Sequence, residues 1–167
     1  TKTREIILQY FDIIAIAELG GNTFMATNTN TVTLFLKRRS NQESIKLKEY
    51  VNKFSTEFID NTINGIEKPV SKYVSYVWET VSFDDYISLL KKEPTNAIKE
   101  HEIYKEYNKK IKAKKETEFW DKLLEIELDK LFYFIIAYPQ QNIVLVKSGE
   151  KDAEKRFLGY YFPDRRG

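Results

Sequence analysis

Phe11-Asp-Ile-Ile-Ala-Ile-Ala-Glu-Leu-Gly-Gly21 is the stretch that decides the fold of this chain. Its nearly continuous apolar run, from Asp12 to Leu19, predicts a short strand that is buried on both faces. A second run, from Thr31 to Leu36, is rich in strand-forming residues and predicts another strand. The loop between them carries many short hydroxyl and amide side chains, which can bind a ligand or only stabilise a turn. The apolar spacing over residues 4–11 predicts a helix that leads into the first strand.

The composition is that of a globular chain with one domain, or one domain with an extension. Of the 167 residues 42% are hydrophobic, and 27 basic and 25 acidic side chains leave a net charge of +2. That balance does not indicate an anionic partner, so only local clusters of charge could. The absence of cysteine excludes disulfides and thiolate metal sites and agrees with a cytoplasmic location.

Two further features concern the context of the chain. Its longest apolar run, Leu131 to Tyr138, is far shorter than the roughly 20 residues of a membrane helix, and we expect no membrane partner. The chain begins without an initiator Met, inside an apparent helix, and we expect it to be a piece of a larger protein.

Residues 41–138 carry mainly helical patterns. Apolar residues at helical spacing predict helices over 41–59 and 117–138, and Ser82 with Asp85 is similar to a capping box. Pro94 is expected in the first turn of a further helix that runs to about residue 115. This helix and the one over 117–138 would form a long antiparallel hairpin. Residues 70–81 fit either an edge strand or a short helix, and residues 142–147 predict a compact strand.

Two separated segments resemble adenine-N6 DNA methyltransferases of the type I modification-subunit and fused restriction-modification kind. The first runs from Ala17 to Lys37, Ala-Glu-Leu-Gly-Gly-Asn-Thr-Phe-Met-Ala-Thr-Asn-Thr-Asn-Thr-Val-Thr-Leu-Phe-Leu-Lys, and is similar to the region after the catalytic motif. The second, Gly149 to Gly167, contains Phe-Leu-Gly-Tyr-Tyr-Phe-Pro-Asp-Arg-Arg-Gly, where the family carries Phe-Leu-Gly-Tyr-Glu-Phe-Ser-x-Arg-Arg-Gly. Tyr161 and Pro163 depart from that pattern.

The resemblance implies an α/β fold. Residues 1–40 would be the C-terminal helix and the last two strands of a Rossmann-like methyltransferase sheet, with the final strand antiparallel. Residues 41–167 would be a mainly helical insertion or extension with a basic terminal segment. The Asn/Asp-Pro-Pro-Tyr/Phe catalytic motif and the glycine loop for S-adenosylmethionine are not in this sequence. We therefore expect this segment alone to be inactive and not to bind the cofactor.

The implied function of the parent protein is transfer of a methyl group from S-adenosylmethionine to adenine N6 in DNA, within a restriction-modification system. Its implied partners are DNA, the remainder of the methyltransferase, and a specificity or restriction subunit. Phe24 matches the aromatic that packs on the flipped target base in the family, and neighbouring polar residues would support it. The residues expected at the target base are Phe24, Thr27, Asn28 and Thr29. The alternative for Phe24 is a core residue beside Met25.

Basic residues gather in the segment that carries the second match, and they could contact the DNA backbone or form an ordinary solvated surface. The cluster comprises Lys147, Lys151, Lys155, Arg156, Arg165 and Arg166. The lysine-rich run over 105–115 could follow phosphates, but glutamates flank it and favour a solvated helix face. His101 has no second ligand at metal spacing and is expected to be an exposed helix residue, and Trp78 and Trp120 are expected to be core anchors.

A function of a different class also fits the sequence. The chain could be a non-catalytic helical module that binds DNA or another protein and ends in basic residues. The loop with Phe24 favours the methyltransferase, because such a module does not require it.

Overall fold

The computed structural model describes residues 2–19, 31–139, 144–148 and 158–161. The chain divides into two compact units, Thr1–Ser44 with Tyr138–Gly167, and Ile45–Ala137. The sequence division placed residues 41–167 together, whereas in this arrangement the chain returns to the first unit at residue 138. The fold class is α/β and mostly helical. No described helix is long and apolar enough to cross a membrane.

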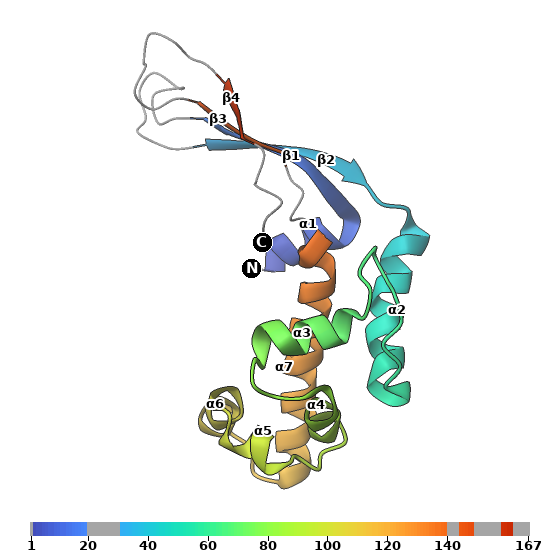
Figure 1. The fold of residues 1–167 in the computed structure, drawn as a ribbon, viewed down its shortest axis with the longest axis vertical. Helices are drawn as coiled ribbons and strands as arrows, with labels where there is room; N and C mark the ends of the chain where they lie inside the picture. The colour runs from blue at the N-terminus through green and yellow to red at the C-terminus, as the bar shows by residue number, and fades with distance from the viewer. Residues whose placement is uncertain (1, 20–30, 140–143, 149–157, 162–167) are drawn as a thin grey trace. The chain divides into compact units, whose positions relative to one another are not determined.

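Among its described residues, the first unit contains the helix α1 (Lys2–Tyr10) and a four-stranded sheet (Figure 1). This helix leads directly into β1 (Phe11–Leu19), and β2 (Thr31–Arg38) pairs with β1 in antiparallel register from Phe11↔Arg38 to Leu19↔Thr31. The strand β3 (Val144–Ser148) runs parallel to β1, and β4 (Leu158–Tyr161) runs antiparallel to β3. The strand order is β2-β1-β3-β4. The expected helix and strands over 4–36, and the strand near 142–147, are thus confirmed.

The expectation that β1 is buried on both faces is wrong. Of its described side chains only Ala17 is buried, and Ile14 is half exposed. A register shift between Ile13 and Ala15 interrupts the alternation and turns Ile14 outward. The apolar run therefore forms a strand whose side chains are only partly buried within this unit.

A cluster of polar contacts joins α1, β1 and the start of α2 (Asn41–Glu57). The buried Arg39 forms an ion pair with Asp12 at 2.6 Å, and its backbone N–H donates to the carbonyl of Tyr10. Ser44 Oγ donates to the carbonyl of Gln9 at 3.2 Å. These bonds hold the end of β2 and the first turn of α2 against α1.

The second unit is made of helices. Residues 70–81, which fitted either a strand or a helix, form a helix followed by a turn, because Pro69 supplies a first-turn proline. After α2, the helices are α3 (Pro69–Val77), α4 (Phe83–Leu90), α5 (Asn96–Glu100), α6 (Glu102–Lys110) and α7 (Glu116–Ala137). Ser82 caps α4 as expected, since its Oγ accepts the Asp85 N–H and donates to the Asp85 carboxylate.

Two expectations about residues 94–138 are corrected. Pro94 lies before the helix rather than in its first turn, because Thr95 occupies the N-cap position of α5. The expected long helix to residue 115 is interrupted at His101, which has extended backbone angles. The long helical hairpin is therefore absent from the described chain, and α7 packs with short helices instead.

The core of the second unit contains large aromatic and aliphatic side chains. Trp78 is fully buried and Trp120 is nearly so, which confirms both as core anchors. The other buried side chains include Leu47, Phe54, Tyr73, Tyr86, Leu89, Ile98, Leu123, Leu131, Ile135 and Ile136.

Candidate functional site

Four strand ends lie side by side at one edge of the sheet in the first unit, namely the edge that runs across the strands. The end of β1 lies beside the start of β2, because Leu19 pairs with Thr31. It also lies beside the end of β3, because Glu18 pairs with Lys147, and Ser148 of β3 pairs in turn with Leu158 at the start of β4. Residues 20–30 and residues 149–157 are therefore both attached to this same edge, although they are far apart in the sequence.

Most of the expected site residues belong to these two attached segments. Phe24, Thr27, Asn28 and Thr29 lie outside the residues that the structure describes, as do Lys151, Lys155 and Arg156. Arg165 and Arg166 follow β4 and are also outside the described residues. Lys147 is the one member of the basic cluster on a described strand, at the register position next to Glu18. The strands thus bring the attachment points of the expected base loop and of the segment with Lys151, Lys155 and Arg156 to one edge, whereas β4 ends at the opposite edge, where Tyr161 pairs with Leu145.

The second unit contains a buried carboxylate that was not expected from the sequence. Glu127, on α7, is fully buried and accepts three hydrogen bonds. Tyr73 Oη donates to its Oε1 at 2.6 Å, Trp78 Nε1 donates to the same oxygen at 2.8 Å, and the Tyr107 hydroxyl donates to Oε2. Lys130 Nζ donates to Tyr107 Oη at 2.7 Å and lies over its ring. The cluster ties α7 to α6 and to the middle and C-terminal end of α3.

The environment of this carboxylate changes the acidity of the surrounding tyrosines. Burial, and then the charge of Glu127, raise the pKa of the Tyr73 and Tyr107 hydroxyls well above the ordinary value. The pKa of Tyr86 is raised for the same reasons. Because the donors occupy both oxygens of a fully buried carboxylate, the cluster holds helices together and does not offer a group to a substrate.

His101 is not the exposed helix residue that the sequence predicted. It lies between α5 and α6, where its Nδ1 accepts the backbone N–H of Ile103 at 3.2 Å and caps α6. Its ring packs against Trp78 with the centroids 4.9 Å apart. Within the described part of the chain no group of three or more His, Cys, Asp or Glu residues could hold a metal ion.

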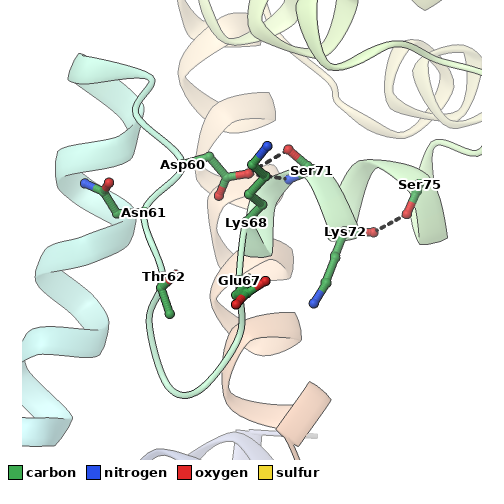
Figure 2. A pocket seen from close by; sticks show the side chains of 8 residues that line it. All are labelled: Asp60, Asn61, Thr62, Glu67, Lys68, Ser71, Lys72 and Ser75. Carbon is green, nitrogen blue, oxygen red and sulfur yellow. Dashed lines mark hydrogen bonds between the residues drawn. The ribbon is translucent and has the colours of Figure 1, made fainter.

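An open hollow of about 570 Å³ lies at the start of α3 (Figure 2). Asp60 accepts the backbone N–H groups of Val70 and Ser71, at 2.9 and 2.8 Å, and the hydroxyls of Ser71 and Tyr50. The N-cap residue Lys68 has a left-handed backbone and makes no side-chain cap. The Asp60 carboxylate caps α3 in its place. The lining residues are Asp60, Asn61, Thr62, Glu67, Lys68, Ser71, Lys72 and Ser75. The donors at the helix start are thus already satisfied by the protein.

The lysine-rich run over 105–115 is partly a paired helix face, as the flanking glutamates indicated. Lys105 pairs with Glu102 at 2.9 Å, and Lys110 pairs with Glu106 at 2.7 Å, in both cases on the exposed side of α6. Helix α6 ends at Lys110, so Lys109 lies in its last turn, and Lys112, Lys114 and Lys115 lie in the connection to α7.

Comparison with known proteins identifies no relative. The chain matches no family model, no curated protein and no solved structure.

Proposed function

We propose that this chain is part of a restriction-modification DNA methyltransferase that transfers a methyl group from S-adenosylmethionine to adenine N6. The observation that carries the proposal is the shared sheet edge. There the end of β1 is followed by the segment with Phe24, and the end of β3 is followed by the segment with Lys151, Lys155 and Arg156. A target base and its flanking phosphates are contacted together when a base is flipped from a duplex. The antiparallel pair that follows α1 agrees with the expected end of a Rossmann-like sheet.

In this proposal the present segment supplies the surface for the target base and for DNA, while the catalytic motif belongs to the remainder of the enzyme. Phe24 stacks on the flipped adenine, with Thr27, Asn28 and Thr29 around it. Lys147, Lys151, Lys155, Arg156, Arg165 and Arg166 contact the DNA backbone. S-adenosylmethionine binds to the complete cytoplasmic enzyme, and a specificity or restriction subunit is a further partner.

The central experiment uses the product of the complete reading frame. Labelled S-adenosylmethionine and unmethylated DNA should yield N6-methyladenine, detected by mass spectrometry of the digested DNA. Since stacking of a base on an aromatic contributes roughly 1 to 3 kcal/mol, Phe24→Ala should reduce methyl transfer by roughly five-fold to over a hundredfold. Phe24→Tyr, which keeps the aromatic face, is the matched control.

Thermal melting of the same variants separates the two roles of Phe24. A base-contacting residue leaves the melting temperature nearly unchanged, whereas a core residue lowers it strongly when truncated. Normal turnover in the Phe24→Ala variant would exclude the stacking of Phe24 on the target base. No methyl transfer by the complete wild-type protein, on DNA of any sequence, would end the proposed function.

The isolated chain offers a second test. Isothermal titration should show no binding of S-adenosylmethionine at micromolar concentrations, because the glycine loop of the family is not in this sequence. Micromolar affinity for the cofactor would contradict the proposal that S-adenosylmethionine is bound by the remainder of the enzyme and not by this segment.

A non-catalytic helical module that binds DNA or another protein is the second candidate. The observation that favours it is the compact helical unit Ile45–Ala137, which has its own buried core. An Asn-Pro-Pro-Tyr or Asp-Pro-Pro-Phe motif upstream in the parent reading frame decides for the methyltransferase.

A further inference from the structure

The last turn of α6 and its connection to α7 concentrate positive charge. Five of the seven residues 109–115 are lysines, and none of the seven is acidic. Four of these lysines form no ion pair among the described residues, and all four are exposed. These linker lysines are Lys109, Lys112, Lys114 and Lys115.

Neighbouring lysines are neutralised by nearby carboxylates, so the linker lysines stand apart from them. Lys105 and Lys110 pair along α6, and Lys122 pairs with Glu118 at 2.7 Å on the first turns of α7. Glu102, Glu106 and Glu118 are engaged in these contacts, and the linker lysines are exposed without an ion pair among the described residues, so their positive charge faces solvent. A solvated helix face with alternating pairs would not leave such a cluster.

The backbone of the connection is held in place by contacts that do not use the linker side chains. The N–H of Ile111 donates to the Tyr107 carbonyl at 2.9 Å and ends α6. Lys122 Nζ donates to the carbonyl of Lys112 at 3.1 Å, and the N–H of Lys114 donates to Glu118 Oε2 at 3.0 Å. Both anchors come from α7. A backbone fixed in this way presents several cations together and reduces the entropy lost when they meet a ligand.

We propose that the linker lysines bind the phosphate backbone of duplex DNA. A lysine ammonium is a compact point charge with three donors, which suits contact with phosphates without reading the bases. Several adjacent cations gain from release of counterions condensed on the duplex, and this gain grows with each phosphate contacted. The choice of DNA as the polyanion rests on the proposed function, whereas the cationic surface rests only on the described contacts.

The experiment compares two quadruple variants of the full chain. The test variant replaces the linker lysines with alanine, and the control replaces Lys46, Lys48, Lys53 and Lys99, which are exposed helical lysines elsewhere in the sequence. Both lose the same charge. Binding of a fluorescein-labelled duplex of arbitrary sequence, about 20 base pairs long, is measured by anisotropy between about 50 and 200 mM salt.

We expect the test variant to bind at least roughly tenfold more weakly at about 50 mM salt, with a salt slope shallower by about 0.9 for each lost contact. The control should change affinity much less. Equal losses in the two variants, or an unchanged affinity and slope in the test variant, would overturn the proposal. Substitution of the linker lysines by arginine should retain binding, and a loss there as large as with alanine would equally contradict it.

Two additional measurements separate DNA from an acidic protein as the ligand, and the linker lysines from the basic terminal cluster. Polyglutamate of similar charge should compete weakly with the duplex, and preferential binding to it would assign the surface to an acidic protein instead. Replacing Lys155, Arg156, Arg165 and Arg166 with alanine tests the basic terminal cluster separately, and the linker contribution should remain in that variant. If the complete protein transfers no methyl group but the linker effect persists, the proposed function fails while the DNA surface stands.

Discussion

The sheet unit and the helical unit differ in how far they bury their apolar side chains. In the helical unit several of the largest side chains, including Trp78, Tyr73 and Tyr86, are fully buried. In the sheet unit, among the described residues, the buried apolar side chains are Leu8 and Ala17, while Val32 and Phe35 on β2 are 58% and 54% exposed. The helical unit therefore completes its own core, whereas the sheet unit presents apolar strand surface that another surface can cover.

The position of β2 strengthens this contrast. It is an outer strand of the described sheet, has eight residues and lacks proline, and the one register shift in its pairing lies on β1, at Ile14. Its charged residues are confined to its end, at Lys37 and Arg38. Natural sheets usually protect such edges with charge, proline or irregularity, and an unprotected edge invites pairing with another strand.

The largest expected effect concerns the core of the helical unit. Glu127→Ala should lower the free energy of unfolding by about 3 to 5 kcal/mol, because three buried donors lose their acceptor and a cavity is left behind. Urea unfolding followed by circular dichroism measures the change. Glu125→Ala, at an exposed position of the same helix, is the control and should differ from wild type by about 0.5 kcal/mol at most. Similar losses in both would mean that the carboxylate does not organise this core.

The next prediction addresses the sheet unit. The chain should self-associate at high concentration through β2, and the double variant Val32→Lys, Leu34→Lys should weaken that association by about tenfold or more. Analytical ultracentrifugation over a range of concentrations measures it. Tyr76→Lys, at an exposed aromatic of the helical unit, is the control. A wild-type chain that stays monomeric at the highest concentration would contradict the prediction that the sheet unit presents an apolar surface for association.

A smaller effect should appear at alkaline pH. Burial raises the pKa of Tyr73, Tyr86 and Tyr107 above the ordinary value of 10, so these hydroxyls keep their protons in the folded chain and lose them on unfolding. Their contribution to stability is complete below about pH 10 and declines as the pH rises toward the folded pKa. The decline is about 1.4 kcal/mol per pH unit for each tyrosine.

Tyr86→Phe sharpens this pH test. The Tyr86 hydroxyl is buried and has no hydrogen-bond partner among the described residues, so its removal should be neutral or slightly stabilising at about pH 7. The same variant should make the alkaline decline shallower by about one tyrosine's share. Urea unfolding at about pH 7, 10 and 11 measures both effects, and an unchanged slope would exclude Tyr86 from the titrating group.

Local patterns predicted most elements of the fold. The apolar spacing of α2 and α7, the strand runs of β1 and β2, and the Ser82 cap were each readable from neighbouring residues. A second capping box, Ser40-Asn-Gln-Glu43, was also readable and was missed, and the structure shows its reciprocal bonds. Features that depend on distant partners were not accessible, such as the parallel pairing of β1 with β3.

The candidate residues show the same limit. Glu127 lies on the apolar stripe of α7, four residues after Leu123 and four before Leu131, and an acid at such a position is a signal of a buried carboxylate. Its donors Tyr73, Trp78 and Tyr107 could not be inferred, because α3 and α6 bring them together only in the folded unit. His101 was misjudged for a related reason, since its contact with Trp78 comes from another part of the chain.

The parallel pairing of β1 with β3 has a consequence for the order of folding. Ala15 pairs with Val144 only after the whole helical unit has been traversed, whereas β1 and β2 are joined by residues 20–30. Closing an unstructured loop of residues 20–143 costs about 2 kcal/mol more than closing residues 20–30, because the entropy cost grows with the logarithm of loop length. The contacts among the helices of the second unit, from α2 to α7, are more local in sequence and form faster. A nascent chain should therefore complete its helices before its sheet, with β3 and β4 added last.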